Sequence, residues 1–247
     1  MKGFLFAILF GLVCLLTGCS TTRAKSTGIV IVGVGQSAKY GKCEGATTDA
    51  ATMNGILSQY GTPTILLNSK ATKANVVKAL QAAAQNDLLI FTFSGHGGSD
   101  PIGDVSGETD GKNEYLCLYN TYLLDNEIWN IVNSAKNRVL LIFDCCHSET
   151  MFRSPGIAFT NALSSVDGTN TAFRSSKVTM LCWSGCADSA YSYGDAKGGN
   201  LTNAIRDAFD KDLTYGKMWI KVRTKVPSYQ IPRKTEIGSW PNTKVFR

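Results

Sequence analysis

Apolar, strand-like runs that alternate with helical segments restrict this chain to few folds. The runs lie at residues 28–34, 63–67, 87–94, 138–144 and 177–184. The first is continuous and rich in β-branched residues, which is typical of a parallel strand buried on both faces. Repeated strand–helix–strand units joined by right-handed crossovers predict an α/β fold. We expect a three-layer sandwich with a mostly parallel central sheet and helices on both faces.

Helical periodicity fills most of the stretches between these runs. Helices are predicted at residues 48–60, 73–85, 125–135 and 200–211. Thr72 and Asp125 stand where the N-caps of the second and third helices are expected. Residues 219–226 fit either a helix or an extended segment, and residues 243–246 are predicted to form a last edge strand.

Reactive residues follow directly after three of the predicted strands. In an open parallel sheet, functional residues gather beyond the carboxyl ends of the strands. Those ends carry Ser94-Gly-His-Gly97, Asp144-Cys-Cys146 and Trp183-Ser-Gly-Cys186. The chain has only two histidines, His96 and His147, and both lie in or next to these segments. One edge of the sheet is therefore the expected functional site.

A cysteine and a histidine form the strongest candidate for catalysis. A thiol needs a nearby imidazole to act as a nucleophile near neutral pH. Adjacent cysteines at a strand end, Cys145 and Cys146, are difficult to explain by packing alone, although spacing does not tell which is the nucleophile. His147 follows Cys146 directly, and adjacent side chains on extended backbone point apart. His96 is therefore the better candidate base, and His147 is expected to be structural.

The two segments resemble the signature motifs of metacaspases, and more broadly of the caspase-like (clan CD) cysteine peptidases, including the bacterial orthocaspase type. Ser94-Gly-His-Gly97 is similar to the first motif and Asp144-Cys-Cys-His-Ser148 to the second. His96 precedes Cys146 by about 50 residues, as in caspases. The resemblance implies that Cys146 is the nucleophile and His96 the base. It also implies that the backbone N–H groups of Gly97 and Cys146 hold the oxyanion.

The same resemblance extends to the substrate pocket. Gly45-Ala-Thr-Thr-Asp-Ala50 is similar to the family segment that follows the first strand. The resemblance implies that these side chains line substrate pockets: Asp49, Ser94, Asp144, Trp183 and Ser184. Taken singly, Asp49 also fits an acid at a helix N-terminus, and Asp144 a turn residue at a strand end. Together, two carboxylates select arginine or lysine by charge pairing.

These observations predict a cysteine endopeptidase that cleaves peptides or proteins after arginine or lysine through a Cys–His dyad. Two alternatives stay open. One is a catalytically silent scaffold or binding lipoprotein with a caspase-like fold, although such relatives usually lose the histidine or the cysteine. The other is an unrelated thiol enzyme such as an acyltransferase, which would not need Asp49 and Asp144. Self-processing, where it occurs, is expected at Arg153, Arg174 or Lys177.

No metal or cofactor is predicted, and activation by calcium stays open. Many members of the family bind calcium through a cluster of acids. Residues 110–120 are similar to that acidic segment, but Asn113 and Asn120 stand where aspartates are common. Asp125-Asn-Glu127 likewise carries one asparagine in an acidic run. Calcium prefers several charged oxygen ligands, so these departures weaken the expectation.

The first residues are predicted to be a targeting segment. Lys2 gives a charged start, residues 4–16 are apolar, and Leu16-Thr-Gly-Cys19 resembles the lipobox of bacterial lipoproteins. We expect a signal peptide at 1–18, a lipidated Cys19, a tether at 19–27 and a peptidase domain at 28–247. The chain is then expected to be anchored to a membrane of the bacterial cell envelope, unless Cys19 is incidental in a plain secretory signal. Basic residues form no cluster interleaved with aromatics, so no nucleic-acid partner is predicted.

Overall fold

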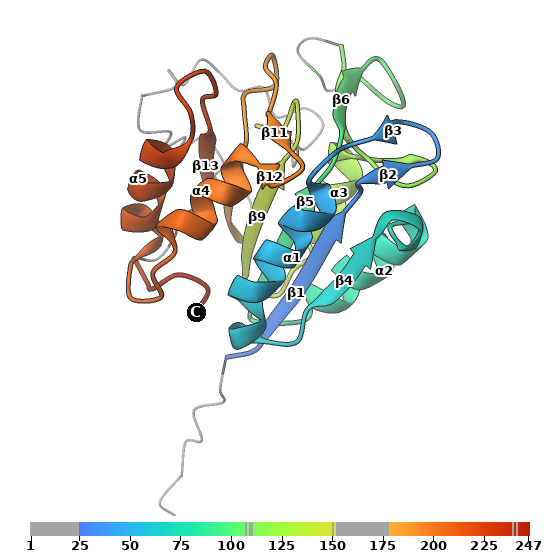
Figure 1. Cartoon of the computed structure of the whole chain (residues 1–247). Helices are drawn as coiled ribbons and strands as arrows, with labels where there is room; N and C mark the ends of the chain where they lie inside the picture. Colours follow the sequence, from blue (N-terminus) through green and yellow to red (C-terminus); the bar gives the residue numbers. More distant parts are fainter. Residues whose placement is uncertain are drawn as a thin grey trace, which may run out of the picture.

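A six-stranded sheet forms the centre of the protein, and its strands follow the order β13-β10-β9-β5-β1-β4 (Figure 1). The computed structural model describes residues 25–106, 108, 111–149, 151, 178–238, 240 and 242–247. The strands of this sheet are β1 (Thr27–Gly33), β4 (Thr64–Leu67), β5 (Leu88–Ser94), β9 (Arg138–Asp144), β10 (Thr179–Ser184) and β13 (Arg233–Ile237). Neighbouring strands run parallel, except that β13 is antiparallel to β10.

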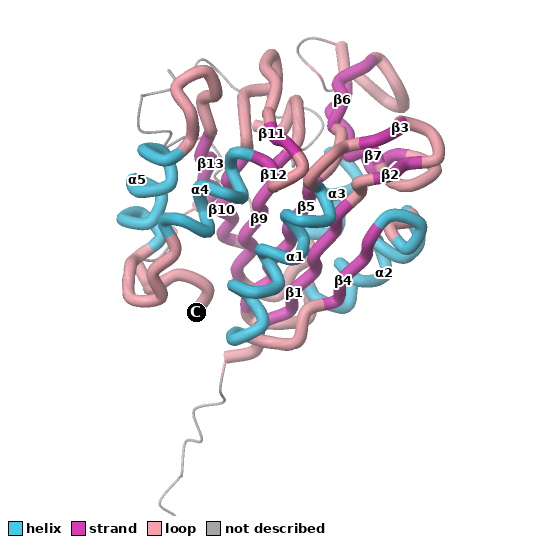
Figure 2. The backbone as a smooth tube through the Cα atoms, in the orientation of Figure 1, coloured by secondary structure: helices cyan, strands magenta, loops and turns pink. Residues whose placement is uncertain are grey.

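Helices cover both faces of the sheet, as Figure 2 shows. They are α1 (Ala46–Leu57), α2 (Lys73–Ala83), α3 (Asp125–Val132), α4 (Asn200–Ala208) and α5 (Tyr215–Lys225), with short 3-10 helices η1 (Ser58–Tyr60) and η2 (Asn68–Lys70). Successive residues of β1 face opposite layers. Ile31 packs in a core with Leu57 of α1, whereas Val32 packs in a second core with Leu80 of α2 and Ile128 of α3. The predicted three-layer α/β fold is therefore confirmed.

Short antiparallel elements gather at the carboxyl edge of the parallel strands (upper part of Figure 1). They are the hairpin β2 (Gln36–Ser37) and β3 (Gly41–Lys42), the three-stranded sheet β6 (Gly97–Asp100), β7 (Asn113–Cys117) and β8 (Tyr122–Leu124), and the hairpin β11 (Gly194–Asp195) and β12 (Gly198–Gly199). Each follows a strand or precedes a helix of the central fold. They surround the edge at which the reactive residues were expected.

Two helix starts test the predicted caps. The Thr72 hydroxyl accepts a hydrogen bond from the Asn75 N–H at 3.3 Å and caps α2, as predicted. Asp125 was predicted to cap α3, and this is wrong by one residue. Leu124 is the N-cap, and its N–H donates to the Glu127 carboxylate at 3.0 Å. Asp125 is instead the first helical residue, and its carboxylate belongs to the acidic cluster described below.

The C-terminal region differs most from the expectation. Residues 219–226, which fitted either state, lie mostly in α5. Residues 243–246 do not form the predicted edge strand, because Lys244 makes only an isolated bridge to Thr214 while Val245 and Phe246 fill the core. The edge position belongs to β13, whose charged residues hide its strand pattern. No helix among the described residues has the length and apolarity needed to cross a bilayer. Cys19, Arg153, Arg174 and Lys177 lie outside the described residues.

The packing of α2 on the sheet gives a direct test of the core. Leu80 is fully buried, whereas the next residue, Gln81, is exposed. Leu80→Ala should lower the free energy of unfolding by about 2–5 kcal/mol, because it removes buried methyl groups and leaves a cavity. Gln81→Ala should change it by less than about 0.5 kcal/mol. Urea titrations of both variants measure these values, and equal losses would contradict the packing of α2.

Candidate active site

The pairing of β5 with β9 brings the two sequence motifs side by side. Ser94 and Asp144, the last residues of these strands, are direct partners in the parallel register. His96 and Cys146 each follow two residues beyond this pair. The backbones also touch, because a β-carbon at Gly97 would clash with the carbonyl oxygen of Cys146. The structure therefore places both predicted dyad residues at one point on the sheet edge.

The adjacent cysteines occupy different environments. Cys145 is only 2% exposed and belongs to the apolar core, and burial raises the pKa of its thiol well above the ordinary value. Cys146 is half-buried, and its Sγ lies 3.7 Å from the Ser192 carbonyl oxygen. Burial also raises the pKa of the Cys146 thiol. Of these two adjacent cysteines, only Cys146 combines a position beside His96 with access to solvent.

A backbone carbonyl fixes the orientation of the His96 ring. Its Nε2 lies 2.9 Å from the carbonyl oxygen of Lys42, at the end of β3. A carbonyl oxygen can only accept, so in the neutral ring Nε2 carries the hydrogen and donates it. The lone pair is then on Nδ1, which is the atom able to take a proton.

His147 is held away from this chemistry. Its backbone has a positive φ of 52°, and its Nδ1 contacts the carbonyl oxygen of Asp188. The ring also packs edge-on against Tyr191, with ring centroids 5.6 Å apart. These contacts agree with the structural role expected for His147.

Two buried carboxylates lie beside the predicted dyad. Asp49 accepts hydrogen bonds from the Ser94 hydroxyl at 2.5 Å and from the Gly199 N–H at 2.9 Å. Asp144 accepts from the Thr202 N–H at 2.8 Å, at the start of α4, and from the Ser192 hydroxyl at 2.7 Å. The structure thus brings Asp49, Ser94 and Asp144 together, as the sequence implied.

Positive charge balances these carboxylates only in part, since the charge of Arg206 lowers the pKa of Asp49 by less than burial and the Asp144 charge raise it. Among the described residues, neither Asp49 nor Asp144 makes a salt bridge with a lysine or arginine. Burial and the neighbouring Asp144 charge raise the pKa of Asp49 to about 7. Burial likewise raises the pKa of Asp144. A cationic group placed between the two would relieve this unfavourable arrangement.

Sequence reasoning missed the hairpin that covers the carboxylates. Gly198 has φ 118°, and a β-carbon on it would clash with the Asp49 carboxylate. A β-carbon on Gly199 would clash with the Asp144 carboxylate. Glycine is required at both positions because the backbone passes directly over the acids. The Gly198-Gly199 pair ahead of a helix was the one available signal, since its N–H groups suit an anionic partner.

The prediction that Trp183 and Ser184 line substrate pockets requires correction. Trp183 is 0% exposed and packs against Tyr215 and Trp219, with ring centroids 6.1 and 5.5 Å away. The buried Ser184 hydroxyl donates to the Cys186 carbonyl oxygen at 3.3 Å. Because β10 is covered by helices, Trp183 belongs to the core rather than to a surface. Both residues lie beneath the site and support it.

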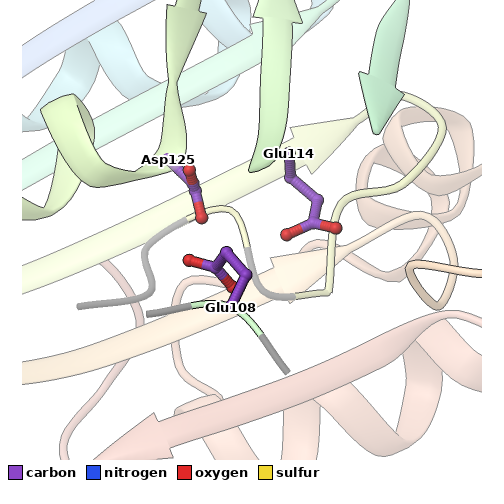
Figure 3. A group of neighbouring side chains, drawn as sticks. All are labelled: Glu108, Glu114 and Asp125. Carbon is purple, nitrogen blue, oxygen red and sulfur yellow. The ribbon is translucent and has the colours of Figure 1, made fainter. Parts of the chain in front are cut away.

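Three acidic side chains converge at a second place near the site (Figure 3). Glu108, Glu114 and Asp125 bring carboxylate oxygens within 4.8 Å of one another, and Glu114 and Asp125 are buried. Hard divalent cations such as Ca²⁺ bind sets of carboxylate oxygens of this kind. The Ser99 hydroxyl of β6 donates to Glu114 at 3.1 Å, which links the cluster to the segment that follows His96.

Two of the residues first considered for calcium, Asn113 and Glu127, have other partners in the structure, and Asp110 lies outside the described residues. The Asn113 amide donates to the Ile102 carbonyl oxygen at 2.5 Å and shapes the loop before β7. Glu127 accepts the Leu124 N–H and pairs with Lys73 at 2.6 Å. The acidic cluster is therefore built from Glu108 and Glu114, which the sequence did not single out, together with Asp125.

Comparison with known proteins agrees with this geometry. The Caspase domain family matches residues 28–244. The chain is 31% identical over 157 residues to metacaspase-1A of Aspergillus terreus, and 31% identical over 170 residues to metacaspase-1A of Aspergillus oryzae. These matches cover 54% and 60% of this chain but 38% and 39% of the two relatives. The chain thus spans well under half the length of the curated relatives it matches.

Two solved structures share the fold. A Geobacter sulfurreducens protein superposes with a TM-score of 0.70 at 24% identity, covering 89% of this chain and 98% of that one. Caspase-1 from Spodoptera frugiperda superposes with a TM-score of 0.57 at 13% identity, covering 86% and 89%. At these identities the likeness concerns the fold alone. Because the family match extends over most of the sequence, the chain belongs to the Caspase domain family, a family of cysteine peptidases.

Proposed function

We propose that this protein is a cysteine endopeptidase that cleaves peptide bonds after arginine or lysine. The observation that carries the proposal is the pair of buried carboxylates, Asp49 and Asp144, which make no salt bridge among the described residues and lie beside the half-buried Cys146 thiol. The paired motifs and the family match support a thiol nucleophile. The carboxylates support a cationic side chain on the residue before the cleaved bond.

His96 acts as the base in the first step. Because burial raises the Cys146 pKa, the resting thiol is protonated, and Nδ1 of His96 takes its proton as the sulfur attacks the substrate carbonyl carbon. The Lys42 carbonyl holds the ring in the required tautomer. The N–H groups of Gly97 and Cys146 stabilise the negative oxygen of the tetrahedral intermediate.

The same histidine completes the reaction. The carbon–nitrogen bond breaks when the protonated His96 gives its proton to the leaving amine, and a thioester remains on Cys146. Water then attacks the thioester while His96 removes a proton from it. The new carboxylic acid leaves, and the proton returns to the Cys146 sulfur.

Charge decides the specificity. A guanidinium or ammonium group between Asp49 and Asp144 replaces carboxylate repulsion with attraction. An aspartate side chain in the same position would add a third negative charge. We therefore expect no cleavage after aspartate.

We further propose that Glu108, Glu114 and Asp125 hold a Ca²⁺ ion. A bound cation would neutralise the converging carboxylates and tie β7 to the start of α3. Because Ser99 bonds Glu114, the ion would also steady β6 directly after His96 and Gly97. Its role is to order the structure, and no reaction step passes through it.

We also propose that Cys19 carries a lipid anchor in the bacterial cell envelope. The lipobox-like segment supports this location. β1 begins at Thr27, at the amino end of the parallel strands, whereas the candidate site lies at their carboxyl end. An anchor at that point would leave the site open to protein substrates.

Substitution of each cysteine separates the nucleophile from its neighbour. Cys146→Ala should lower cleavage of fluorogenic peptides ending in arginine or lysine by at least about 10³-fold, because the attacking sulfur is gone. Cys145→Ala changes a core thiol and should keep activity within about tenfold, with a modest loss of stability. Steady-state assays under reducing conditions measure both. Full activity in Cys146→Ala would rule out the proposed nucleophile.

Asp49 gives the activity a defined pH dependence. Its carboxyl must be ionised to bind a cation, so kcat/KM for arginine peptides should rise as pH increases through about 7. Asp49→Asn should lower kcat/KM for these peptides by about 10²-fold and remove their advantage over neutral peptides. Asp212→Asn, a change at an exposed acid, is the matched control and should leave kcat/KM unchanged. A wild-type profile that stays flat between pH 6 and about 8 would contradict the role of Asp49.

The same substitution should raise stability. The folded-state pKa of Asp49 lies above its unfolded value of 3.8, so ionisation destabilises the folded protein as pH rises from about 4 through 7. Asp49→Asn should therefore raise Tm at pH 8 by at least about 2 °C, with a smaller gain at pH 5. Asp212, whose pKa is lowered by Lys244, should show no such gain when changed to asparagine. Scanning fluorimetry at the two pH values measures the difference.

Calcium binding has its own test. Adding Ca²⁺ should raise the Tm of the wild-type chain, because the ion binds the folded acidic cluster. Glu114→Gln should remove most of that rise, whereas Glu236→Gln, an acid on β13, should keep it. Calorimetric titration with Ca²⁺ gives a second readout independent of activity. An undiminished shift in Glu114→Gln would place any bound ion elsewhere.

A further inference from the structure

Gln230 is a buried amide whose neighbours on both sides in the loop are exposed. It lies between α5 and β13 and is 4% exposed, while its neighbours Tyr229 and Ile231 are 68% and 62% exposed. The loop therefore turns one polar side chain inward and leaves the adjacent aromatic and aliphatic side chains in solvent. Burying an amide is unfavourable unless its hydrogen-bonding groups are satisfied. The contacts of Gln230 show how this is achieved.

All parts of the amide are used. Nε2 donates to the Gly185 carbonyl oxygen at 2.9 Å and to the Ser192 hydroxyl at 3.0 Å. Oε1 accepts from the Tyr193 N–H at 2.9 Å and from the Asn200 side chain at 3.0 Å. An amide has two donor hydrogens and one acceptor oxygen with two lone pairs. This full set of partners fixes the orientation of the amide. If the amide were rotated by 180°, its NH₂ group would face the Tyr193 N–H and its oxygen would face the Gly185 carbonyl oxygen.

The direction of Gln230 sets the direction of Ser192. A hydroxyl has a single hydrogen to donate. Because Nε2 of Gln230 donates to the Ser192 oxygen, that single hydrogen is free to point at Asp144, 2.7 Å away. The result is a one-way chain from the Gln230 amide through the Ser192 hydroxyl to the Asp144 carboxylate. Each bond in such a chain polarises the next, and the last one favours the ionised acid.

The same contacts reach the sulfur. The carbonyl oxygen of Ser192 lies 3.7 Å from the Cys146 Sγ, and Gln230 holds the same peptide group through the Tyr193 N–H. One side chain thus fixes both the hydroxyl that faces the acid and the peptide that faces the thiol. No substrate atom needs to touch it.

We propose that Gln230 is a positioning residue that acts through Ser192 to keep Asp144 charged and correctly placed for the basic side chain of the substrate. This inference rests on the proposed cleavage after arginine or lysine. It adds a residue that lies far along the sequence from both motifs and has no direct role in the chemistry. Its effect should appear in substrate binding and pH dependence rather than in the attack itself.

A double-mutant cycle tests whether Gln230 works through Ser192. Gln230→Met and Ser192→Ala should each lower kcat/KM for an arginine peptide by about tenfold, mostly through KM. The double variant should be no worse than Ser192→Ala alone, because the two residues act in one chain. If Gln230 merely holds the loops together, the two losses should multiply. Gln85→Met, at an exposed site after α2, is the control for the substitution itself.

The pH profile gives a second readout. Among the described residues, the titratable groups that interact with Asp144 are Asp49 and the thiols of Cys43, Cys145 and Cys146. Asp49 and Asp144 must both be ionised to bind a cation, so both contribute to the acid limb of kcat/KM. Both single variants should shift that limb to higher pH, because Asp144 loses support for its charged form. Gln230→Glu would place a carboxylate oxygen against the Gly185 carbonyl oxygen, so Ser192→Ala, which removes only a hydroxyl, is the variant that should fold even where Gln230→Met does not. It should show the same upward shift. Multiplying losses, or an acid limb that stays in place, would overturn the inference.

A binding measurement separates this inference from the proposed function. Agmatine carries the guanidinium of arginine, and its binding to the Cys146→Ala chain can be measured by calorimetry without any cleavage. We expect Gln230→Met to weaken agmatine binding about tenfold when Ser192 is present and hardly at all in Ser192→Ala. If the wild type cleaves the peptide and the Gln230 variants keep the same kcat/KM and agmatine affinity, the inference is overturned and the proposed function stands. Agmatine binding that depends on Gln230, without any peptide cleavage, would support the inference and overturn the peptidase. Absence of both cleavage and binding would overturn both.

Discussion

Parallel pairing of β5 with β9 is the contact on which the rest of the site depends. The register that sets Ser94 against Asp144 also sets the two loops beyond them side by side. A shift of one residue would turn the alternating side chains of either strand toward the wrong layer and separate His96 from Cys146. Two apolar cores stabilise that register, because side chains on opposite faces of the same strands pack into one core or the other. The positions of His96 and Cys146 at the edge of the sheet therefore depend on the packing of the two apolar cores.

The two carboxylates of the candidate site lower the stability of the folded protein. Two carboxylates are buried side by side, and the hydrogen bonds from Ser94, Gly199, Ser192 and Thr202 offset only part of the cost of removing them from water. The pKa of Asp49 rises to about 7 for this reason. Such strain is commonly located where a ligand of opposite charge is bound. In the proposed peptidase, the basic side chain of the substrate would supply the opposite charge that the two carboxylates lack.

Local patterns in the sequence were enough to predict the layers, most of the strands and the two motifs, because each depends on neighbouring residues. Asp49 could be placed only through the family resemblance. Trp183 was misplaced, since a residue at the end of a motif strand can face either the edge or the core, and only the helices packed on it decide which. The charged strand β13 and the roles of Ser192, Gly199 and Gln230 could not be predicted. Their partners lie far away in the sequence. A loop whose backbone packs on a carboxylate, as Gly199 packs on Asp144, has no periodic sequence pattern that would predict it.

The distance along the chain between partners has a consequence for the order in which the protein matures. Asp49 is bonded by Gly199, which follows it by 150 residues, and Asp144 is bonded by Thr202, which follows it by 58. Gln230 comes later still. A ribosome therefore releases His96 and Cys146 well before it releases the segments that bond the two carboxylates. In the proposed peptidase, the N–H groups of Gly199 and Thr202, which bond the carboxylates that would select the substrate, therefore become available only after the proposed nucleophile has been synthesised.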